Sequence, residues 1–348
     1  GGLTCSEYNE YLGEHIDLGG AWLADNHARM HELVQEFKVP LIRQFVTGQE
    51  VTVDGTTRHV GDVGSFPGRQ AALPELQSAI AKLEAALADV DIDAPWTHPQ
   101  ADEFDAITFA AWIDQNVETL ALREFIAIST YAYFGVMPTE VSFLETLHLF
   151  KTCGDIIFMG DTHTGGQAAH MMGSQLVSEG LAATVNGVVS LNSPVRRIVQ
   201  NDQSVTVECD ASTWQGKQVI CTLPPVMINR LEFEPALPAY RRAFHQRCPI
   251  GRYTKAILTY ETPFWREQGL SGIAASLDNG MTGIFDLGDA ESKRGVISIL
   301  FGGEPSIQLD DATEAERDQI ILDQVASALG EAGRHPVEMI VQQWVNEP

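Results

Sequence analysis

Apolar residues recur every three to four positions in several stretches of the chain, which is the spacing of helices that bury one face in a core. These stretches are residues 30–37, 73–90 and 141–150. A further helix is predicted to begin at Thr313, because Thr313 and Glu316 have the spacing of a capping box, and to end at Gly330. We interpret these stripes as structural core.

Other stretches alternate between apolar and polar residues or hold short apolar runs, which are the patterns of β-strands. Strands are predicted at residues 188–189, 195–199, 205–208, 218–223, 253–260 and 295–301. Helix-rich and strand-rich stretches alternate in blocks, which predicts a mixed fold, α+β or α/β, with domains that interleave along the sequence. The length of 348 residues leaves room for two substantial domains.

Lys255 stands in the middle of the alternating stretch 253–260, on the face that it shares with Ile257. A buried ammonium group must find a partner or face a polar ligand. The pattern alone favours a simpler interpretation, in which the lysine lies on an exposed or edge strand and opposes aggregation. This stretch alone does not distinguish a buried Lys255 from an exposed one, and other parts of the sequence are needed to do so.

The excess of acidic residues argues against some classes of function. The formal net charge is −25, from 47 acidic and 22 basic residues, which argues against a nucleic acid partner because phosphate binding needs clustered lysine and arginine. No apolar run is long enough to predict a membrane span, and the first residues lack the pattern of a secretory signal. The scattered cysteines predict reduced, mostly buried thiols in a cytoplasmic protein; they are Cys5, Cys153, Cys209, Cys221 and Cys248.

Few local motifs point to chemistry. Asp161, His163 and His170 are residue types that ligate metals, but their spacing fits no metal motif, so solvated loop residues are favoured and no metal is expected. No GxSxG elbow supports a serine hydrolase, and no GxGxxG fingerprint is present. The pair Gly19-Gly20 permits a close backbone approach to a ligand, and the GGQ element at residues 165–167 can place an amide next to one. Both equally fit plain turns.

Taken in order along the chain, these and other short elements form one pattern. The elements are DLGGAW at 17–22, DAPW at 93–96, TEVS at 139–142, GGQ at 165–167, GSQ at 173–175, VRRIVQ at 195–200, TLPP at 222–225, FEPALP at 233–238, GRYTK at 251–255, FWR at 264–266 and Trp344. In their order and spacing the chain resembles the flavin-containing monoamine oxidases over essentially all of its length.

The resemblance implies an FAD-binding domain and a substrate-binding domain woven from alternating segments. It assigns residues 1–40 and 172–246 to a partial FAD-binding domain, and residues 41–171 and 247–348 to a substrate-binding domain with a mixed sheet and flanking helices. It also implies the reaction of the family, in which an amine is oxidised to an imine that hydrolyses to an aldehyde, while O2 becomes H2O2.

The resemblance further implies roles for particular residues. Lys255 would hold a water at the flavin N5 atom, Gln167 and Tyr133 would line the substrate cavity, and Trp344 would lie beside the flavin. Lys255, Gln167 and Trp344 are the implied catalytic residues. The implied FAD contacts are Gly19, Gly20, Ala21, Trp22, Val195, Thr222, Lys255 and Trp344.

The sequence departs from the family pattern at both ends. The GxGxxG unit of the family would precede Gly1, and Leu3 stands where an arginine is usual. The C-terminal FAD segment, with both tyrosines of the aromatic cage, would follow Pro348. We therefore expect a fragment of the working enzyme, with sheet edges that favour association, including a homo-oligomer.

The sequence also fits other interpretations. A non-catalytic remnant or interaction module on the same fold would fit the missing phosphate loop and cage. Within the catalytic class, a polyamine oxidase or an L-amino-acid oxidase is possible, while the GGQ and FWR elements favour monoamines. The expected partners are FAD, a small amine and O2.

Overall fold

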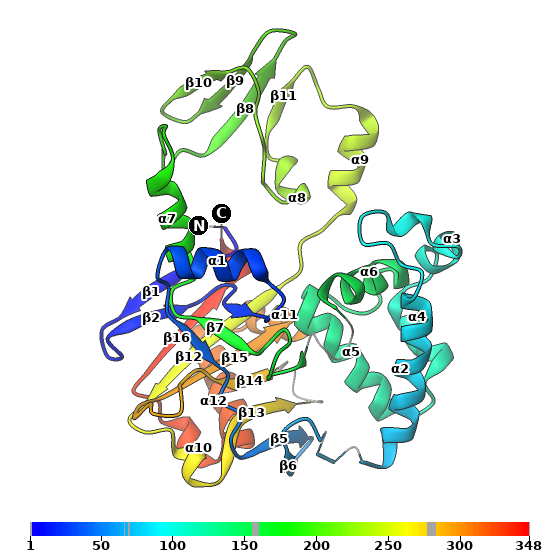
Figure 1. Ribbon diagram of the computed structural model, residues 1–348, viewed down its shortest axis with the longest axis vertical. Helices are drawn as coiled ribbons and strands as arrows, with labels where there is room; N and C mark the ends of the chain where they lie inside the picture. Colours follow the sequence, from blue (N-terminus) through cyan, green and yellow to red (C-terminus); the bar gives the residue numbers. More distant parts are fainter. Residues whose placement is uncertain (1, 66, 69, 155–159, 277–282, 348) are drawn as a thin grey trace. The chain divides into compact units, whose positions relative to one another are not determined.

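The structure is a computed structural model that describes residues 2–65, 67–68, 70–154, 160–276 and 283–347. The chain packs as two compact units. The large unit comprises Gly1–Gly180 and Arg252–Pro348, and the small unit comprises Leu181–Gly251. Helices and mixed sheets alternate along the chain (Figure 1), which confirms the expected mixed fold. The assignment of segments to FAD-binding and substrate-binding domains stays a prediction.

A large mixed sheet organises the large unit. Among the described residues, its strands follow the order β16-β12-β15-β14-β13-β5-β6. Their bounds are Glu338–Gln343 for β16, Tyr253–Tyr260 for β12, Gly295–Gly302 for β15, Gly283–Asp286 for β14, Leu270–Ser276 for β13, Gln49–Asp54 for β5 and Thr57–Asp62 for β6. Because β12 pairs with both β15 and β16, it is an inner strand. The edge-strand interpretation of Lys255 is therefore wrong.

Helices that pack beside this sheet include α10 (Phe264–Glu267), α11 (Glu304–Asp311) and α12 (Glu314–Leu329). Ile321 and Val325 of α12 share a fully buried core with Leu258 of β12. The predicted capping box is confirmed, since the Thr313 hydroxyl accepts a hydrogen bond from the Glu316 backbone and the Glu316 carboxylate accepts one from Thr313.

A helical part of the large unit has a core of its own. Its helices are α2 (Leu73–Leu87), α3 (Ala101–Asp105), α4 (Phe109–Asn116), α5 (Leu120–Phe134) and α6 (Phe143–Cys153). Phe143 and Phe150 are fully buried among them, as the predicted stripe at 141–150 requires, and Phe109 is buried beside them. Short 3₁₀ turns are η1 (Gln70–Ala72), η2 (Pro95–Thr97), η4 (Glu331–Arg334) and η5 (Trp344–Asn346). Within the described chain, no helix is long and apolar enough to cross a membrane.

Two small sheets complete the large unit. Strands β1 (Ser6–Asn9) and β2 (Glu14–Asp17) form a hairpin, while β3 (Trp22–Leu23), β7 (Ala169–Met171) and β4 (Leu41–Arg43) form a sheet in that order. Helix α1 (Ala28–Glu36) confirms the first predicted helix and packs Val34 against Met171. In the register of β3 and β7, Trp22 lies opposite His170.

The small unit is a sheet with two helices. The sheet order is β10-β9-β8-β11, with bounds Thr213–Gly216, Val205–Cys209, Val195–Gln200 and Glu232–Glu234. Its helices are α8 (Pro225–Ile228) and α9 (Ala239–Arg247), and α7 (Gln175–Thr184) runs across the boundary between the units. The strands predicted at 195–199 and 205–208 are confirmed.

Two predicted strands are wrong. Residues 188–189 and 218–223 are coil, and neither segment pairs with a strand in the part of the chain that is described. An apolar run becomes a strand only where a neighbour takes up its backbone hydrogen bonds. Ile220 is instead 89% exposed.

The cysteines are less buried than expected. Cys221 is exposed and the other four are half-buried, so the prediction of mostly buried thiols is wrong. The scattered positions of the cysteines did not indicate which side of each element faces the core, so the sequence could not predict their burial. Partial burial still raises the pKa of the Cys5 and Cys153 thiols, which keeps both of them protonated.

Candidate active site

Lys255 is a buried cation whose partners are main-chain oxygens. It lies in the inner strand β12 and is only 3% exposed. Its Nζ donates hydrogen bonds to the carbonyl oxygens of Asp17, at 2.5 Å, and Gly19, at 3.1 Å. An ammonium group has three N–H donors, so one donor remains for a ligand beyond these two contacts.

Burial makes the Lys255 ammonium unusually acidic. It lowers the pKa of Lys255 to about 8, and the negative charge of Asp17 acts in the opposite direction. At neutral pH the side chain is therefore mainly charged, yet it gives up its proton more readily than an exposed lysine. The Asp17 charge is one of the factors that keep Lys255 cationic.

Asp17 is a buried carboxylate of the DLGGAW motif that was not among the predicted site residues. Its Oδ1 accepts hydrogen bonds from the Ser174 backbone and hydroxyl, both at 2.8 Å, and its Oδ2 accepts one from the Gly173 backbone at 2.9 Å. It thereby joins the end of β2 to the start of α7. The signal in the sequence is an acid between Ile16 and Leu18, two buried apolar residues.

The turn after Asp17 is closely packed against Trp344. A Cβ atom at Gly19 would lie 2.4 Å from the Leu3 carbonyl oxygen and 3.1 Å from Cζ2 of Trp344. The Trp344 indole donates a hydrogen bond to the Leu18 carbonyl at 3.2 Å. Only glycine fits this contact. The structure thus brings Trp344 and Gly19 to the turn that also holds Lys255, while Gly20 lies exposed in the same turn.

Aromatic rings form one side of the site. The Lys255 Nζ lies 5.2 Å from the centroid of the Trp22 ring, within the range of a cation–π contact. Phe285, which was not among the predicted site residues, meets Trp22 edge to face, with the ring centroids 5.1 Å apart. Ala21, which precedes Trp22 in sequence, is buried and anchors β3, since its carbonyl accepts a hydrogen bond from the Met171 backbone.

His170 lies next to this aromatic side and is 1% exposed. The expectation of a solvated loop residue is therefore wrong for His170, because β7 runs between β3 and β4. Its Nε2 is 2.9 Å from the Leu287 carbonyl, so Nε2 carries the proton and donates. Burial lowers the pKa of His170 to about 4; the Leu287 bond opposes this and the charge of Lys255 adds to it.

We expect the free energy of unfolding to fall less at acidic pH in His170→Gln than in the wild type. Between about pH 6.5 and 4, unfolded His170 binds a proton that the folded residue rejects, so the free energy of unfolding falls as the pH falls. Urea unfolding measures the free energy of unfolding at pH 7 and at pH 5. The fall in this free energy from pH 7 to pH 5 should be about 2 kcal/mol smaller in the variant than in the wild type. His163→Gln is the control, because the His163 side chain is 64% exposed. An equal acid dependence of wild type and His170→Gln would contradict this account.

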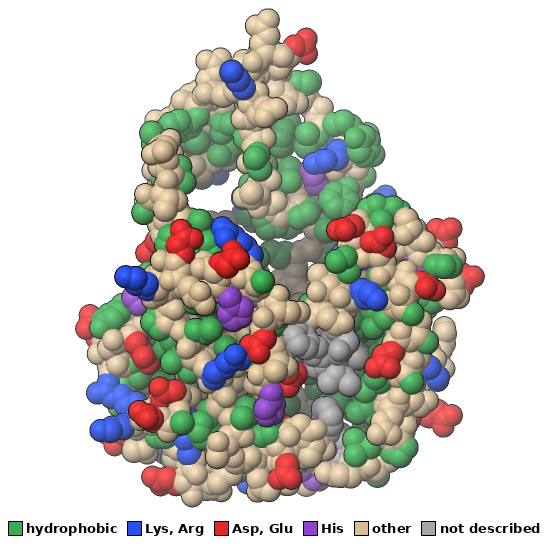
Figure 2. Space-filling view, in the orientation of Figure 1, with side chains coloured by type: hydrophobic (Ala, Val, Ile, Leu, Met, Phe, Trp, Pro, Cys, Tyr) green, Lys and Arg blue, Asp and Glu red, His purple; other side chains and the backbone are tan. Residues whose placement is uncertain are grey.

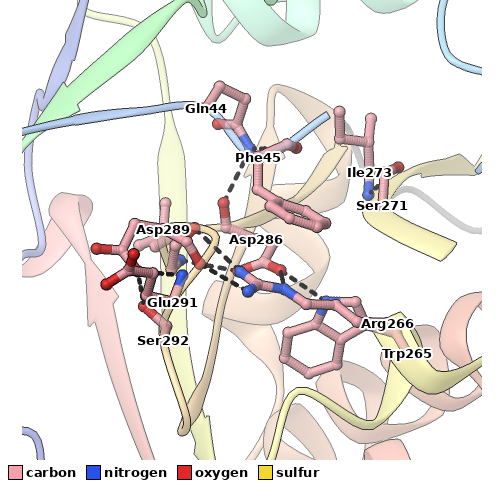
Figure 3. Close-up of polar contacts among 12 residues, drawn as sticks. Gln44, Phe45, Trp265, Arg266, Ser271, Ile273, Asp286, Asp289, Glu291 and Ser292 are labelled. Atoms are coloured by element: carbon pink, nitrogen blue, oxygen red, sulfur yellow. Dashed lines mark hydrogen bonds and ion pairs between the residues drawn. The ribbon is translucent and has the colours of Figure 1, made fainter. Parts of the chain in front are cut away.

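A buried ion pair fixes the end of β14 (Figure 3). Asp286 is fully buried and accepts hydrogen bonds from Arg266 Nε and Trp265 Nε1, both at 2.7 Å, and from the Gly288 backbone at 2.8 Å. The Arg266 guanidinium lies 3.8 Å from the centroid of the Phe45 ring. Burial raises the pKa of Asp286, and the hydrogen bond and charge of Arg266 oppose that rise.

This pair supports the neighbours of the site, because Phe285 and Leu287 flank Asp286 in sequence. Arg266→Ala should cost about 3 kcal/mol of unfolding free energy at pH 7, since it leaves a buried carboxylate without its counter-charge. Arg43→Ala, which breaks an exposed pair with Asp25, is the control and should cost under about 1 kcal/mol. Urea unfolding of both variants measures this; equal losses would refute the structural role of the pair.

Gln167 lies in a loop shaped by Asp161. The Gln167 backbone donates to the Asp161 carbonyl at 3.1 Å, and its half-buried side-chain amide has no hydrogen-bond partner among the described residues. Burial acts to raise the pKa of Asp161, but hydrogen bonds from Thr164, His163 and Gly165 outweigh it and lower the pKa to about 2. The Asp161 carboxylate therefore shapes the loop, and the described part of the chain holds no cluster of metal ligands.

Tyr133 lies on α5 and packs against the helical core. Burial raises the pKa of its hydroxyl. Its neighbour Ala132 accepts a hydrogen bond from the Tyr253 hydroxyl at 2.9 Å. Tyr253 and Lys255 are two residues apart in β12 and so face the same side of the sheet. The hydrogen bond from Tyr253 therefore holds the end of α5 against the side of the sheet on which Lys255 lies. The roles of Tyr133 and Gln167 in lining a substrate cavity stay predictions.

Val195 and Thr222 belong to the small unit. Val195 is the first residue of β8, and Thr222 lies in an exposed coil. Their expected contacts with FAD stay predictions.

The large unit's residues fit a flavin by their chemistry. The indole Nε1 of Trp22 is buried and has no hydrogen-bond partner among the described residues. Buried N–H groups are normally paired, so this donor and the spare donor of Lys255 suit a flat ligand that carries acceptor atoms. Gly19, Gly20 and Trp344 would hold the ring system from the side of the turn.

Comparisons with known proteins agree with this chemistry. The family model for flavin containing amine oxidoreductase matches residues 1–348. The probable flavin-containing monoamine oxidase A of Dictyostelium discoideum is 30% identical over 95% of this chain and 74% of its own length. The putrescine oxidase of Kocuria rosea is 29% identical over 97% of this chain and 73% of its own. A structure of putrescine oxidase bound to putrescine superposes with a TM-score of 0.93 at 25% identity, covering 100% of this chain and 78% of that one.

Proposed function

Because this chain belongs to the family of flavin-containing amine oxidoreductases, we propose that it catalyses the oxidative deamination of primary monoamines with FAD as cofactor. Bound FAD supplies the redox chemistry, taking a hydride equivalent from the amine and passing two electrons to O2. The amine R–CH2–NH2 and O2 thus give the imine R–CH=NH and H2O2. Water then converts the imine to the aldehyde and ammonia.

The buried ammonium of Lys255 is the observation that carries the proposal. Two main-chain oxygens hold its Nζ in place, so its charge and spare donor need no reorganisation during the reaction. A fixed positive charge there would stabilise the negative charge that develops as O2 takes up electrons. Trp22, stacked near the ammonium, would help to exclude water from it.

The side chains expected around the substrate favour one amino group over two. Gln167, Tyr133, Trp22 and Phe285 offer an amide, a phenol and aromatic rings, and none of them is a carboxylate. The second ammonium of a diamine would need an acidic partner when buried. A monoamine with an apolar substituent would place that substituent on the rings.

The test is a comparison of substrates on FAD-loaded protein. We expect benzylamine to release H2O2 with a kcat/KM about tenfold above that of putrescine or L-leucine. Preferential oxidation of putrescine would assign the chain to diamines, and preferential oxidation of L-leucine would assign it to amino acids. A colourless protein that releases no H2O2 from any of the three would support the non-catalytic interpretation.

A further inference from the structure

The small unit is the basic part of an acidic chain. It carries seven basic residues: Arg196, Arg197, Lys217, Arg230, Arg241, Arg242 and Arg247. It carries five acidic residues: Asp202, Glu208, Asp210, Glu232 and Glu234. The chain as a whole has a net charge of −25. An excess of positive charge in this one segment points to an anionic partner.

Four of the five acids of the small unit are paired with arginines of its sheet. Arg196 binds Asp210 at 2.7 Å. Arg197 contacts three further acids, which are Glu208, Glu232 and Glu234. The arginines of α9 make no ion pair with any described residue; they are Arg241, Arg242 and Arg247. Basic and histidine side chains lie beside hydrophobic ones over α9 (Figure 2).

A pocket of about 220 Å³ lies among α8, β11 and α9 of the small unit. Its apolar walls are Ile228, Leu231, Phe233 and Leu237. Arg242 and His245, one turn apart on α9, are its basic residues. Apolar walls with a few polar groups are typical of sites for small molecules.

His245 is the second observation that points to a ligand. It is 2% exposed, and its buried Nδ1 atom has no hydrogen-bond partner among the described residues. Its carbonyl accepts a hydrogen bond from the Asn229 side chain at 3.0 Å, which holds this part of α9 against the end of α8. Buried polar groups without partners are rare and call for an explanation. A bound ligand that accepts a hydrogen bond from this imidazole would explain its position.

We propose that this pocket binds a small organic carboxylate with a short apolar chain. Arg242 supplies the charge and a planar pair of donors that match a carboxylate, and the imidazole of His245 supplies a further donor. The apolar chain packs on Leu231 and Phe233. Phosphate and other fully polar anions fit less well, because they would leave the apolar side chains of Ile228, Leu231 and Phe233 without a partner of their own kind. The site shares no residue with the Lys255 site.

Isothermal titration of the protein with hexanoate, and separately with the uncharged hexanamide, tests the proposal. We expect saturable hexanoate binding with a Kd of about 1 mM and hexanamide binding about tenfold weaker. Arg242→Gln should weaken hexanoate binding about tenfold. Arg241→Gln is the matched control, because Arg241 is its neighbour on α9 but does not line the pocket, and binding should be unchanged.

His245→Phe gives a second readout. It should abolish hexanoate binding and raise the melting temperature, because it removes an unpaired polar group from a buried position. Equal affinity for hexanoate and hexanamide, unchanged binding by Arg242→Gln, or heat that never saturates would each overturn the proposal. The titration needs neither FAD nor an amine substrate, so its failure would not bear on the proposed oxidation.

Discussion

Replacing Lys255 by methionine is expected to slow the oxidation of the reduced enzyme by O2 about 100-fold. Methionine has a similar length but brings no charge and no N–H donor to the place where the Asp17 and Gly19 carbonyls hold the ammonium. Amine binding should change less than about twofold, because Lys255 is held by the protein backbone and the proposed role concerns O2.

Stopped-flow measurement of the reductive and oxidative half-reactions separates the two effects. Lys293→Met is the matched control, since Lys293 is exposed and the same substitution there should leave both half-reactions unchanged. An unchanged oxidative half-reaction in Lys255→Met would exclude the proposed role of the ammonium.

Asp17→Ala is expected to lower the free energy of unfolding by about 4 kcal/mol. The carboxylate accepts hydrogen bonds from Ser6, Gly173 and Ser174, and its loss leaves the half-buried Ser6 donor and the buried Gly173 and Ser174 donors unpaired. It also removes the negative charge that raises the pKa of Lys255. The pKa of Lys255 should therefore fall below about 8, and the residue should lose charge at a lower pH.

Urea unfolding at pH 7 measures the stability of this variant. Asp25→Ala removes an acid whose side chain forms an exposed ion pair with Arg43, and should cost under about 1 kcal/mol. Asp17→Asn should fall between the two, since an amide retains one acceptor oxygen. If Asp17→Ala is as stable as Asp25→Ala, the carboxylate does not hold β2 to α7.

Features set by neighbouring residues could be predicted from the sequence, and features set by distant pairing could not. The capping box of Thr313 is local and was predicted correctly. The run 218–223 has the composition of a strand, but a strand also needs a partner elsewhere in the chain. The pattern around Lys255 could not distinguish an edge strand from an inner one, and only its ordered companions along the chain indicated a buried site.

Contacts between residues distant in sequence also could not be predicted within the site. His170 looked solvated beside polar loop residues, yet β3 and β4 enclose it. Arg266 and Asp286 are 20 residues apart, and no local spacing marks them as a pair. Asp17 was the exception with a local signal, because a carboxylate between two buried apolar residues has to be paired.

Anaerobic mixing of the FAD-loaded protein with benzylamine tests the central proposal most directly. We predict that the visible absorption of the oxidised flavin disappears at a rate that rises with benzylamine concentration. It should return when O2 is admitted, and return about 100-fold more slowly in Lys255→Met. Bound flavin that keeps its oxidised spectrum with benzylamine would contradict the proposal.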